Sequence, residues 1–229
     1  MAAMTDGRVA VIVFAKPPRA GQAKTRLAAS LGDATAAELA RAFLIDTWSM
    51  VRSLEWADPI LATTDVDDSC WSELPGVTVW AQGDGDLGDR MERTLRRALE
   101  TYDAAMVIGS DVPGVPVAAL NQARAALKVA DAAIGPSEDG GYYLIGFRRT
   151  CPVGAFSGVA WSTSRTRADT KARLRALGLA VMKVTPWFDV DVVDDLHRLK
   201  HLGDRLRRTA PETARVLDTL VLAPSSNPP

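Results

Sequence analysis

A basic, glycine-containing loop follows the first apolar segment of the chain. Residues 8–15 (RVAVIVFA) are a nearly continuous apolar run, which is typical of a strand buried on both faces of a sheet. The loop after this run carries four cations and a glycine before a helix begins: Lys16, Arg19, Gly21, Lys24 and Arg26. Point charges, free backbone N–H groups and a helix dipole are the features that bind a polyphosphate. The loop therefore predicts a phosphate site, with a solvated basic turn as the alternative.

Two well-known phosphate-binding motifs do not account for these residues. The first loop is not a Walker A motif, because Ala23 stands where a glycine must precede Lys24. Residues 83–88 (GDGDLG) fit the pattern GxGxxG, but they follow a later strand and their two aspartates would face a pyrophosphate. They favour a loop around a base or ribose, with Arg90 beyond it, over a nicotinamide site. A flexible glycine loop is the alternative.

Aspartates stand in two further loops. Asp111 follows the apolar run 104–109 in a turn with Pro113, where a carboxylate can hold a hard cation or satisfy turn amides. Residues 188–196 (FDVDVVDDL) include Asp191, which is either a second metal ligand or, with Asp194 three residues later, a helix N-cap. Together with the basic loop, these carboxylates describe a metal–polyphosphate site that takes Mg²⁺ or Mn²⁺.

Other candidate motifs give weaker evidence of function. The turn 137–143 (SEDGGYY) can bring bare backbone and two phenols to a substrate, or it is a hairpin turn with buried tyrosines. His197 and His201 lack the glutamate of HExxH, which favours a solvated helix face over a metal pair. There is no GxSxG sequence, and neither Cys70 nor Cys151 has a histidine nearby, which argues against a hydrolase triad.

Strand-like and helix-like segments alternate along the chain and must position these loops. The expected strands are residues 8–15, 59–63, 77–80, 104–109, 130–134, 142–147 and 179–184. The expected helices are residues 34–54, 87–102, 166–177, 192–206 and 211–222, and one that starts at Pro116. This alternation predicts a parallel α/β sheet with right-handed crossovers. No repeat or long linker divides the chain, so we expect one domain over residues 1–222 and a flexible tail over 223–229.

Composition excludes several classes of protein. The chain has 229 residues, 47% of them hydrophobic and 24% charged, as in ordinary soluble globular proteins. Its 27 Lys and Arg balance 28 Asp and Glu, which argues against a nucleic-acid surface or a polybasic membrane anchor. No apolar run approaches the ~20 residues of a membrane span, and two cysteines are too few for a disulfide framework. We therefore expect a cytoplasmic protein that binds neither nucleic acid nor membrane; the sequence leaves a homodimer open.

Five segments in this order resemble one bacterial family. They are residues 14–27 (FAKPPRAGQAKTRL), 85–91 (GDLGDRM), 108–114 (IGSDVPG), 135–146 (GPSEDGGYYLIG) and 189–191 (DVD). The chain resembles the glycosyltransferase-A-like proteins of the arsenosugar-biosynthesis type, within the nucleotide-diphospho-sugar transferase superfamily. Residues 23–27 are also similar to the 2-phospholactate guanylyltransferases, which bind a nucleoside triphosphate there.

The resemblance implies a three-layer α/β/α fold with a mostly parallel mixed sheet, the Rossmann-like glycosyltransferase-A fold. It implies that Lys24, Arg26 and Asp111 are catalytic, and that Asp111 and Asp191 bind the metal. Nucleotide contacts are implied for residues of the basic, glycine-rich and Asp111 loops: Phe14, Ala15, Lys16, Gly21, Lys24, Arg26, Gly85, Gly88, Arg90 and Ser110. The acceptor side is implied for Asp139, Gly140, Gly141 and Tyr142.

Three functions are compatible with these residues. The first is nucleotidyl transfer, in which a phosphorylated or phosphonate acceptor attacks the α-phosphate of a nucleoside triphosphate. Lys24 and Arg26 favour it, since a cation-rich loop suits a triphosphate. The second is glycosyl transfer from a nucleotide sugar to a small acceptor, and the third is a non-catalytic nucleotide-binding module. We also expect Lys24 to be exposed, and therefore to contribute little to stability.

Overall fold

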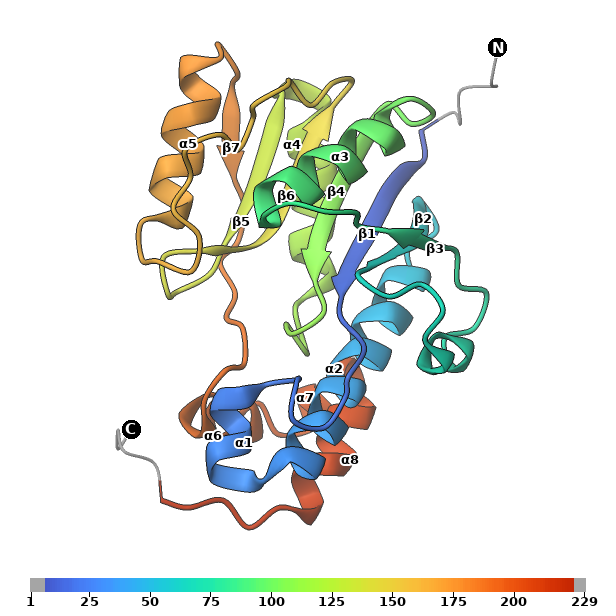
Figure 1. Cartoon of the computed structure of the whole chain (residues 1–229), viewed down its shortest axis with the longest axis vertical. Coiled ribbons are helices and arrows are strands. Elements are labelled where there is room, and N and C mark those ends of the chain that lie inside the picture. Colours follow the sequence, from blue (N-terminus) through green and yellow to red (C-terminus); the bar gives the residue numbers. More distant parts are fainter. Residues whose placement is uncertain (1–6, 225–229) are drawn as a thin grey trace.

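A seven-stranded mixed sheet runs through the chain (Figure 1). The structure is a computed structural model that describes residues 7–224, so most of the expected tail lies outside the described residues. The strands are β1 (Val9–Ala15), β2 (Ala57–Thr63), β3 (Val79–Ala81), β4 (Ala104–Gly109), β5 (Ala132–Pro136), β6 (Tyr142–Arg148) and β7 (Val181–Lys183). Their spatial order is β3-β2-β1-β4-β6-β5-β7. Only β6 runs antiparallel to its neighbours, β4 and β5, so the carboxyl ends of the other strands share one edge.

Helices cover both faces of this sheet. They are α1 (Thr25–Leu31), α2 (Asp33–Arg52), α3 (Leu87–Leu99), α4 (Val117–Val129), α5 (Thr166–Ala176), α6 (Val193–His201), α7 (Asp204–Thr209) and α8 (Pro211–Thr219), with a short 3₁₀ turn at Ser69–Glu73. Alternate residues of β1 pack on opposite sides: Val11 faces Trp48 of α2, whereas Ile12 faces Leu95 of α3. This arrangement confirms the expected three-layer α/β/α fold with a mostly parallel sheet.

A third cluster of buried side chains lies beyond the carboxyl ends of the strands, where α1, α6, α7 and α8 gather around the first half of α2 (Figure 1). Leu27, Phe43 and Leu196 are among its buried members. The buried carboxylate of Asp46 accepts hydrogen bonds from the backbone N–H groups of Glu212 and Thr213, at 3.1 and 2.8 Å, and so fixes the start of α8. This cluster includes Leu27 and thereby anchors the end of the loop that follows β1.

One expected helix is wrong in its extent. The periodic segment 192–206 is divided into α6 and α7, because Gly203 takes a positive φ of 51° that interrupts the helix. A helix that the sequence analysis marked only by its start, α1, occupies Thr25–Leu31 directly after the basic loop. Among residues 7–224, no helix is both long and apolar enough to span a membrane.

Candidate active site

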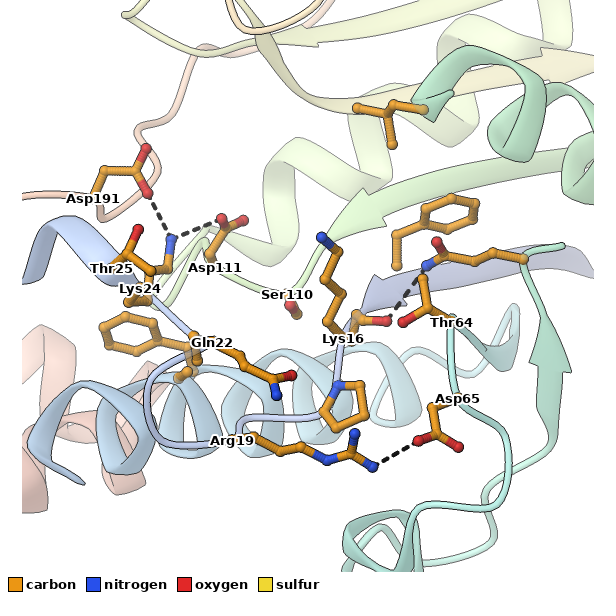
Figure 2. A pocket seen from close by; sticks show the side chains of 18 of the residues that line it. Lys16, Arg19, Gln22, Lys24, Thr25, Thr64, Asp65, Ser110, Asp111 and Asp191 are labelled. Atoms are coloured by element: carbon orange, nitrogen blue, oxygen red, sulfur yellow. Dashed lines mark hydrogen bonds and ion pairs between the residues drawn. The ribbon is translucent and has the colours of Figure 1, made fainter. Parts of the chain in front are cut away.

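A cavity of about 660 Å³ opens at the carboxyl ends of β1, β2 and β4 (Figure 2). Its lining comes from the loops after these strands, from the start of α3 and from the segment before α6. Five cationic side chains line it: Lys16, Arg19, Lys24, Arg26 and Arg90. The crevice beyond the carboxyl ends of parallel strands is where open α/β sheets bind ligands. The loops singled out by the sequence analysis therefore meet in one place.

Lys24 lies between two aspartates from distant parts of the chain (Figure 2). Its Nζ is 2.8 Å from Oδ2 of Asp111 and 2.8 Å from Oδ1 of Asp191. The Lys24 side chain is 11% exposed, so the expectation of an exposed lysine was wrong. The reason is tertiary: the loop turns back at Lys24, which has a positive φ of 45°, and the two carboxylates enclose its ammonium group. Arg26 is the exposed cation instead, at 75%.

The electrostatics of this trio favour the charged forms of Lys24 and Asp111. Burial alone would lower the pKa of Lys24, but the adjacent Asp111 and Asp191 outweigh it and raise that pKa. Burial alone would raise the pKa of Asp111, but the Lys24 charge and hydrogen bond hold it below its usual value. Two carboxylates thus converge on one ammonium group.

Asp191 does not cap a helix, so the N-cap alternative for this residue was wrong. Oδ2 of Asp195 accepts from the backbone N–H groups of Asp191 and Val192, at 2.8 and 2.9 Å, and thereby caps α6. The carboxylate of Asp191 is left to face Lys24, and its Oδ2 is 4.0 Å from Nη1 of Arg26. Asp191 and Asp111 are thus the two carboxylates of the cavity placed to share a cation.

Most of the residues expected to contact a nucleotide line this cavity. Besides Lys24 and Arg26, they are Phe14, Ala15, Lys16, Arg90 and Ser110, and the expected metal ligands Asp111 and Asp191 also line it. The glycines Gly21, Gly85 and Gly88 do not line it. Gly21 and Gly85 have positive φ values of 77° and 100°, so they serve turns of the backbone. A side chain at Gly88 would collide with Trp161 and Phe156, so this glycine allows α3 to pack closely.

A smaller cavity of about 280 Å³ borders the first one and shares Phe14, Leu87, Asp111 and Ser162 with it. Of the residues expected on the acceptor side, Asp139, Gly141 and Tyr142 line this second cavity. Gly140 does not line it. Its φ is +94°, and a Cβ there would overlap the carbonyl oxygen of Ser164, so glycine is required for backbone geometry. The two groups of residues separate into two adjoining cavities that meet at Asp111.

Several lining residues were not identified by the sequence analysis, and three of them lie in or next to the second cavity: Asp189, Trp161 and Ser162. Asp189 lines the second cavity, and its half-buried position beside Asp111 and Asp139 raises its pKa to about 6. The spacing Asp189-Val190-Asp191 was the available signal, because alternate residues of an extended segment point to the same side and Asp191 was already a candidate ligand. Trp161 and Ser162 belong to a loop without any motif; Ser162 has an uncommon positive φ of 57° where the cavities join.

Comparisons with known proteins identify relatives of the chain. Residues 44–163 match the family described as uncharacterized protein conserved in bacteria (DUF2064). A solved structure from Desulfovibrio desulfuricans G20, provisionally named a nucleotide-diphospho-sugar transferase, is 30% identical over 92% of this chain and 96% of its own, with a TM-score of 0.82. No protein of curated function matches the chain.

Two more distant structures share the fold. CMP:2-keto-3-deoxy-manno-octonic acid synthetase in complex with CTP is 12% identical over 86% of this chain and 99% of its own, with a TM-score of 0.56. A cytidylyltransferase from Leptospira borgpetersenii serovar Hardjo-bovis is 11% identical over 94% and 99%, with a TM-score of 0.54. The chain therefore belongs to the DUF2064 family and has the α/β fold of nucleotide-diphospho-sugar transferases and cytidylyltransferases.

Proposed function

We propose that this protein is a transferase that uses a nucleotide, and that it transfers a nucleotidyl group from a nucleoside triphosphate to a small acceptor. The observation that carries the proposal is the first cavity, which five cations line and on which Asp111 and Asp191 converge. A nucleoside triphosphate needs charge compensation along its phosphates, and cations with backbone N–H groups supply it. A fold relative solved with CTP supports the same use of this cavity.

Within this proposal, Lys16 and Arg26 hold the phosphates. Neither has a close hydrogen-bonded partner within residues 7–224, and Lys16 extends into the cavity between Asp111 and Thr64 (Figure 2). Arg90 donates from Nη1 to Oε1 of Gln82 at 3.0 Å, which holds its guanidinium at the cavity wall. Arg19 is occupied by Asp65 and Asp68, so it fixes the loop after β2 rather than a phosphate. Lys16 and Arg26 are thus the cations without a close hydrogen-bonded partner in the described residues, whereas Arg19 and Arg90 are held by protein groups.

The two aspartates fit a divalent cation. Their oxygens are hard ligands and already converge on the Lys24 ammonium group, whose place a cation of higher charge would take. Within residues 7–224 no group of three or more His, Cys, Asp or Glu is arranged to hold a metal, which suits Mg²⁺, an ion commonly held by one or two carboxylates with water and substrate phosphates. Such an ion would neutralise the charge that develops on the departing pyrophosphate.

Glycosyl transfer from a nucleotide sugar is the second candidate. The observation that favours it is the relative from Desulfovibrio desulfuricans G20, whose provisional name describes such an enzyme and whose sequence is 30% identical. The same two cavities would then hold the nucleoside diphosphate and the sugar with its acceptor. In this reaction the carboxylates keep their role at the diphosphate, so the two candidates differ in which bond of the donor breaks.

Thermal unfolding with a ligand panel separates the candidates. The panel is ATP, CTP, GTP, UTP and UDP-glucose, each with and without Mg²⁺. A ligand at ~100 times its Kd adds about 2.7 kcal/mol to the free energy of unfolding, which shifts the melting temperature visibly. Stabilisation by a triphosphate that depends on Mg²⁺ supports nucleotidyl transfer, and stabilisation by UDP-glucose alone favours glycosyl transfer. No response to any nucleotide would refute both.

Arg26→Gln provides the matched test of the site. Arg26 is 75% exposed, so the substitution should leave the melting temperature of the free protein unchanged while the Kd for the triphosphate rises about ten- to a hundredfold. Arg208→Gln is the control, because Arg208 is equally a surface arginine and lines neither cavity. If Arg26→Gln and Arg208→Gln bind the triphosphate with equal affinity, the basic loop does not bind its phosphates through Arg26.

A further inference from the structure

The two adjoining cavities differ in charge. Five cations and three aspartates (Asp65, Asp111 and Asp191) line the first. The charged side chains of the second are Asp111, Asp139 and Asp189, and no described Lys, Arg or His lines it. A phosphorylated acceptor, as expected from the sequence, would have to place its anion among these carboxylates. The lining of the second cavity therefore opposes the expectation for the acceptor while leaving the nucleotide side untouched.

The carboxylates of the second cavity are only partly neutralised. Lys24 compensates Asp111 from the side of the first cavity. The Asp139 carboxylate accepts from Ser137 Oγ and from the backbone N–H of Gly141, at 2.8 Å for the latter, and both donors are uncharged. Asp189 is half-buried, lines this cavity and has no ion pair within the described residues. Two carboxylates thus face the cavity without a cation.

The remaining walls are apolar and aromatic. Phe14, Tyr142 and Trp161 line the cavity, and Trp161 meets Tyr142 edge to face with ring centroids 6.5 Å apart. The indole N–H of Trp161 is buried and has no acceptor among residues 7–224. A buried donor without a partner is costly, and this one belongs to a side chain that lines the cavity where a ligand would bind. The volume of about 280 Å³ limits that ligand to a small molecule.

From these walls and charges we infer that the acceptor is a small molecule without phosphate or carboxylate groups, either uncharged or bearing an ammonium group, with an apolar or ring-shaped body and a reacting hydroxyl. This inference rests on the proposed function and names the substrate class of its second cavity. Carboxylates accept hydrogen bonds from hydroxyl and ammonium groups, and aromatic walls favour both apolar bodies and cations. An anion gains neither contact and meets like charges.

In the proposed nucleotidyl transfer, one bond forms and one breaks at the α-phosphorus. The acceptor hydroxyl oxygen forms a bond to the α-phosphorus, and the bond from that phosphorus to the bridging oxygen breaks. Pyrophosphate leaves with the electron pair, and the hydroxyl proton passes through a carboxylate at the cavity edge to solvent. Asp111 and Ser162, which line both cavities, mark where the two substrates meet.

Three probes with one benzyl body test the charge preference of the second cavity: benzylamine, benzyl alcohol and benzyl phosphate. Binding is measured by calorimetric titration of the whole chain. We expect benzylamine and benzyl alcohol to bind in the millimolar range, and benzyl phosphate to bind at the second cavity at least tenfold more weakly. Absence of binding by both uncharged and ammonium probes, or preference for the phosphate at this cavity, would overturn the inference.

Variants locate each probe. Asp139→Asn and Asp189→Asn remove one charge each and should weaken benzylamine about three- to tenfold, because each deletes an attraction of one partly screened charge pair. Glu100→Gln, at the exposed end of α3 and outside both cavities, should have no effect. Benzyl phosphate held in the first cavity would respond to Arg26→Gln and not to Asp139→Asn. Benzylamine affinity that is insensitive to both aspartate variants would reject the assignment.

This experiment fails or succeeds separately from the test of the proposed function. The benzyl probes need no nucleotide, so they report on the second cavity even if no triphosphate binds. Conversely, Mg²⁺-dependent stabilisation by a triphosphate together with a preference for benzyl phosphate at the second cavity would retain nucleotidyl transfer and restore an anionic acceptor.

Discussion

Replacing Lys24 by methionine tests whether its ammonium group holds the two sides of the active site together. Breaking a buried ion pair costs about 3–5 kcal/mol, and breaking an exposed one costs about 0–1 kcal/mol. Lys24 is 11% exposed, while Asp111 and Asp191 are 39% and 41% exposed, so this trio lies between these limits. We therefore expect the free energy of unfolding to fall by about 1–3 kcal/mol in Lys24→Met, which lowers the melting temperature by roughly 2–12 °C for a chain of this size.

The effect should depend on pH in a defined direction. The pKa of Asp111 is lowered in the folded protein, so its contribution to stability is complete above the usual aspartate pKa of about 3.9 and is lost as the pH falls through the lowered value. The pKa of Lys24 is raised, so its contribution is complete below its usual pKa of about 10.4. The difference between wild type and Lys24→Met should be largest between about pH 5 and 10 and shrink below about pH 4.

Urea unfolding followed by tryptophan fluorescence at pH 7.5 and pH 3.5 measures the stability loss of Lys24→Met and its dependence on pH. Arg208→Met is the control, since it removes an exposed cation that lines neither cavity. A Lys24→Met variant with the stability of wild type at pH 7.5 would refute the reasoning, because it would mean that solvent holds the two carboxylates as well as the lysine does. Greater stabilisation of Lys24→Met than of wild type by Mg²⁺ alone is expected, since the ammonium group no longer competes with the ion for Asp111 and Asp191.

Three further variants address single residues. Asp111→Asn should reduce Mg²⁺-dependent turnover at least about 100-fold. The free energy of unfolding should fall by only about 1 kcal/mol, because the ion pair between Lys24 and Asp191 remains. Turnover at the wild-type rate would exclude Asp111 as a metal ligand. Asp189 has a pKa raised to about 6, so its stabilising contribution is present below about pH 3.9 and lost as the pH rises through 6. Asp189→Asn should therefore be more stable than wild type by about 1–3 kcal/mol at pH 8, allowing for its partial exposure, and equal at pH 4; chemical denaturation at both values checks this. Gly140→Ala should lower the free energy of unfolding by about 2–4 kcal/mol, because φ is +94° and the new Cβ overlaps the Ser164 carbonyl oxygen. The control Gly158→Ala, with φ +77° and open space around the new Cβ, should lower it by about 1 kcal/mol. Equal melting temperatures for the two variants would contradict the clash.

Much of the fold could be predicted because its strands carry a local signal. The apolar runs of β1 and β4 are buried throughout apart from one or two positions, and buried parallel strands need such runs on both faces. The break between α6 and α7 could not be predicted from the apolar periodicity, which continues through Gly203. A glycine inside a helical pattern is compatible with a continuous helix as well as with a turn, and packing decides between them.

The loops of the site were identifiable for the same reason that the sheet was. Loops that follow buried parallel strands lie at one edge of the sheet. Lys16, Lys24 and Asp111 belong to such loops, so the strand direction brings them to the same edge before any side-chain contact is considered. The partners of these side chains were not identifiable. The ion pair from Lys24 to Asp191 joins residues 167 positions apart, and it encloses Lys24, which was expected to be exposed.

The amino-acid sequence by itself determined the strands of the sheet, the order of its loops and the presence of cations and carboxylates at one edge, since buried strands carry a local apolar pattern. The alternation of strands and helices predicted a parallel sheet, and the antiparallel direction of β6 appeared only in the tertiary structure. Only the tertiary structure decided that these groups separate into a cationic cavity and an acidic, aromatic one. The physical reason is that charge compensation depends on distance in space. Lys24 neutralises Asp111 across 87 positions, while Asp189 has no cation in contact within the described residues, although Lys183 and Arg198 are nearer to it in sequence.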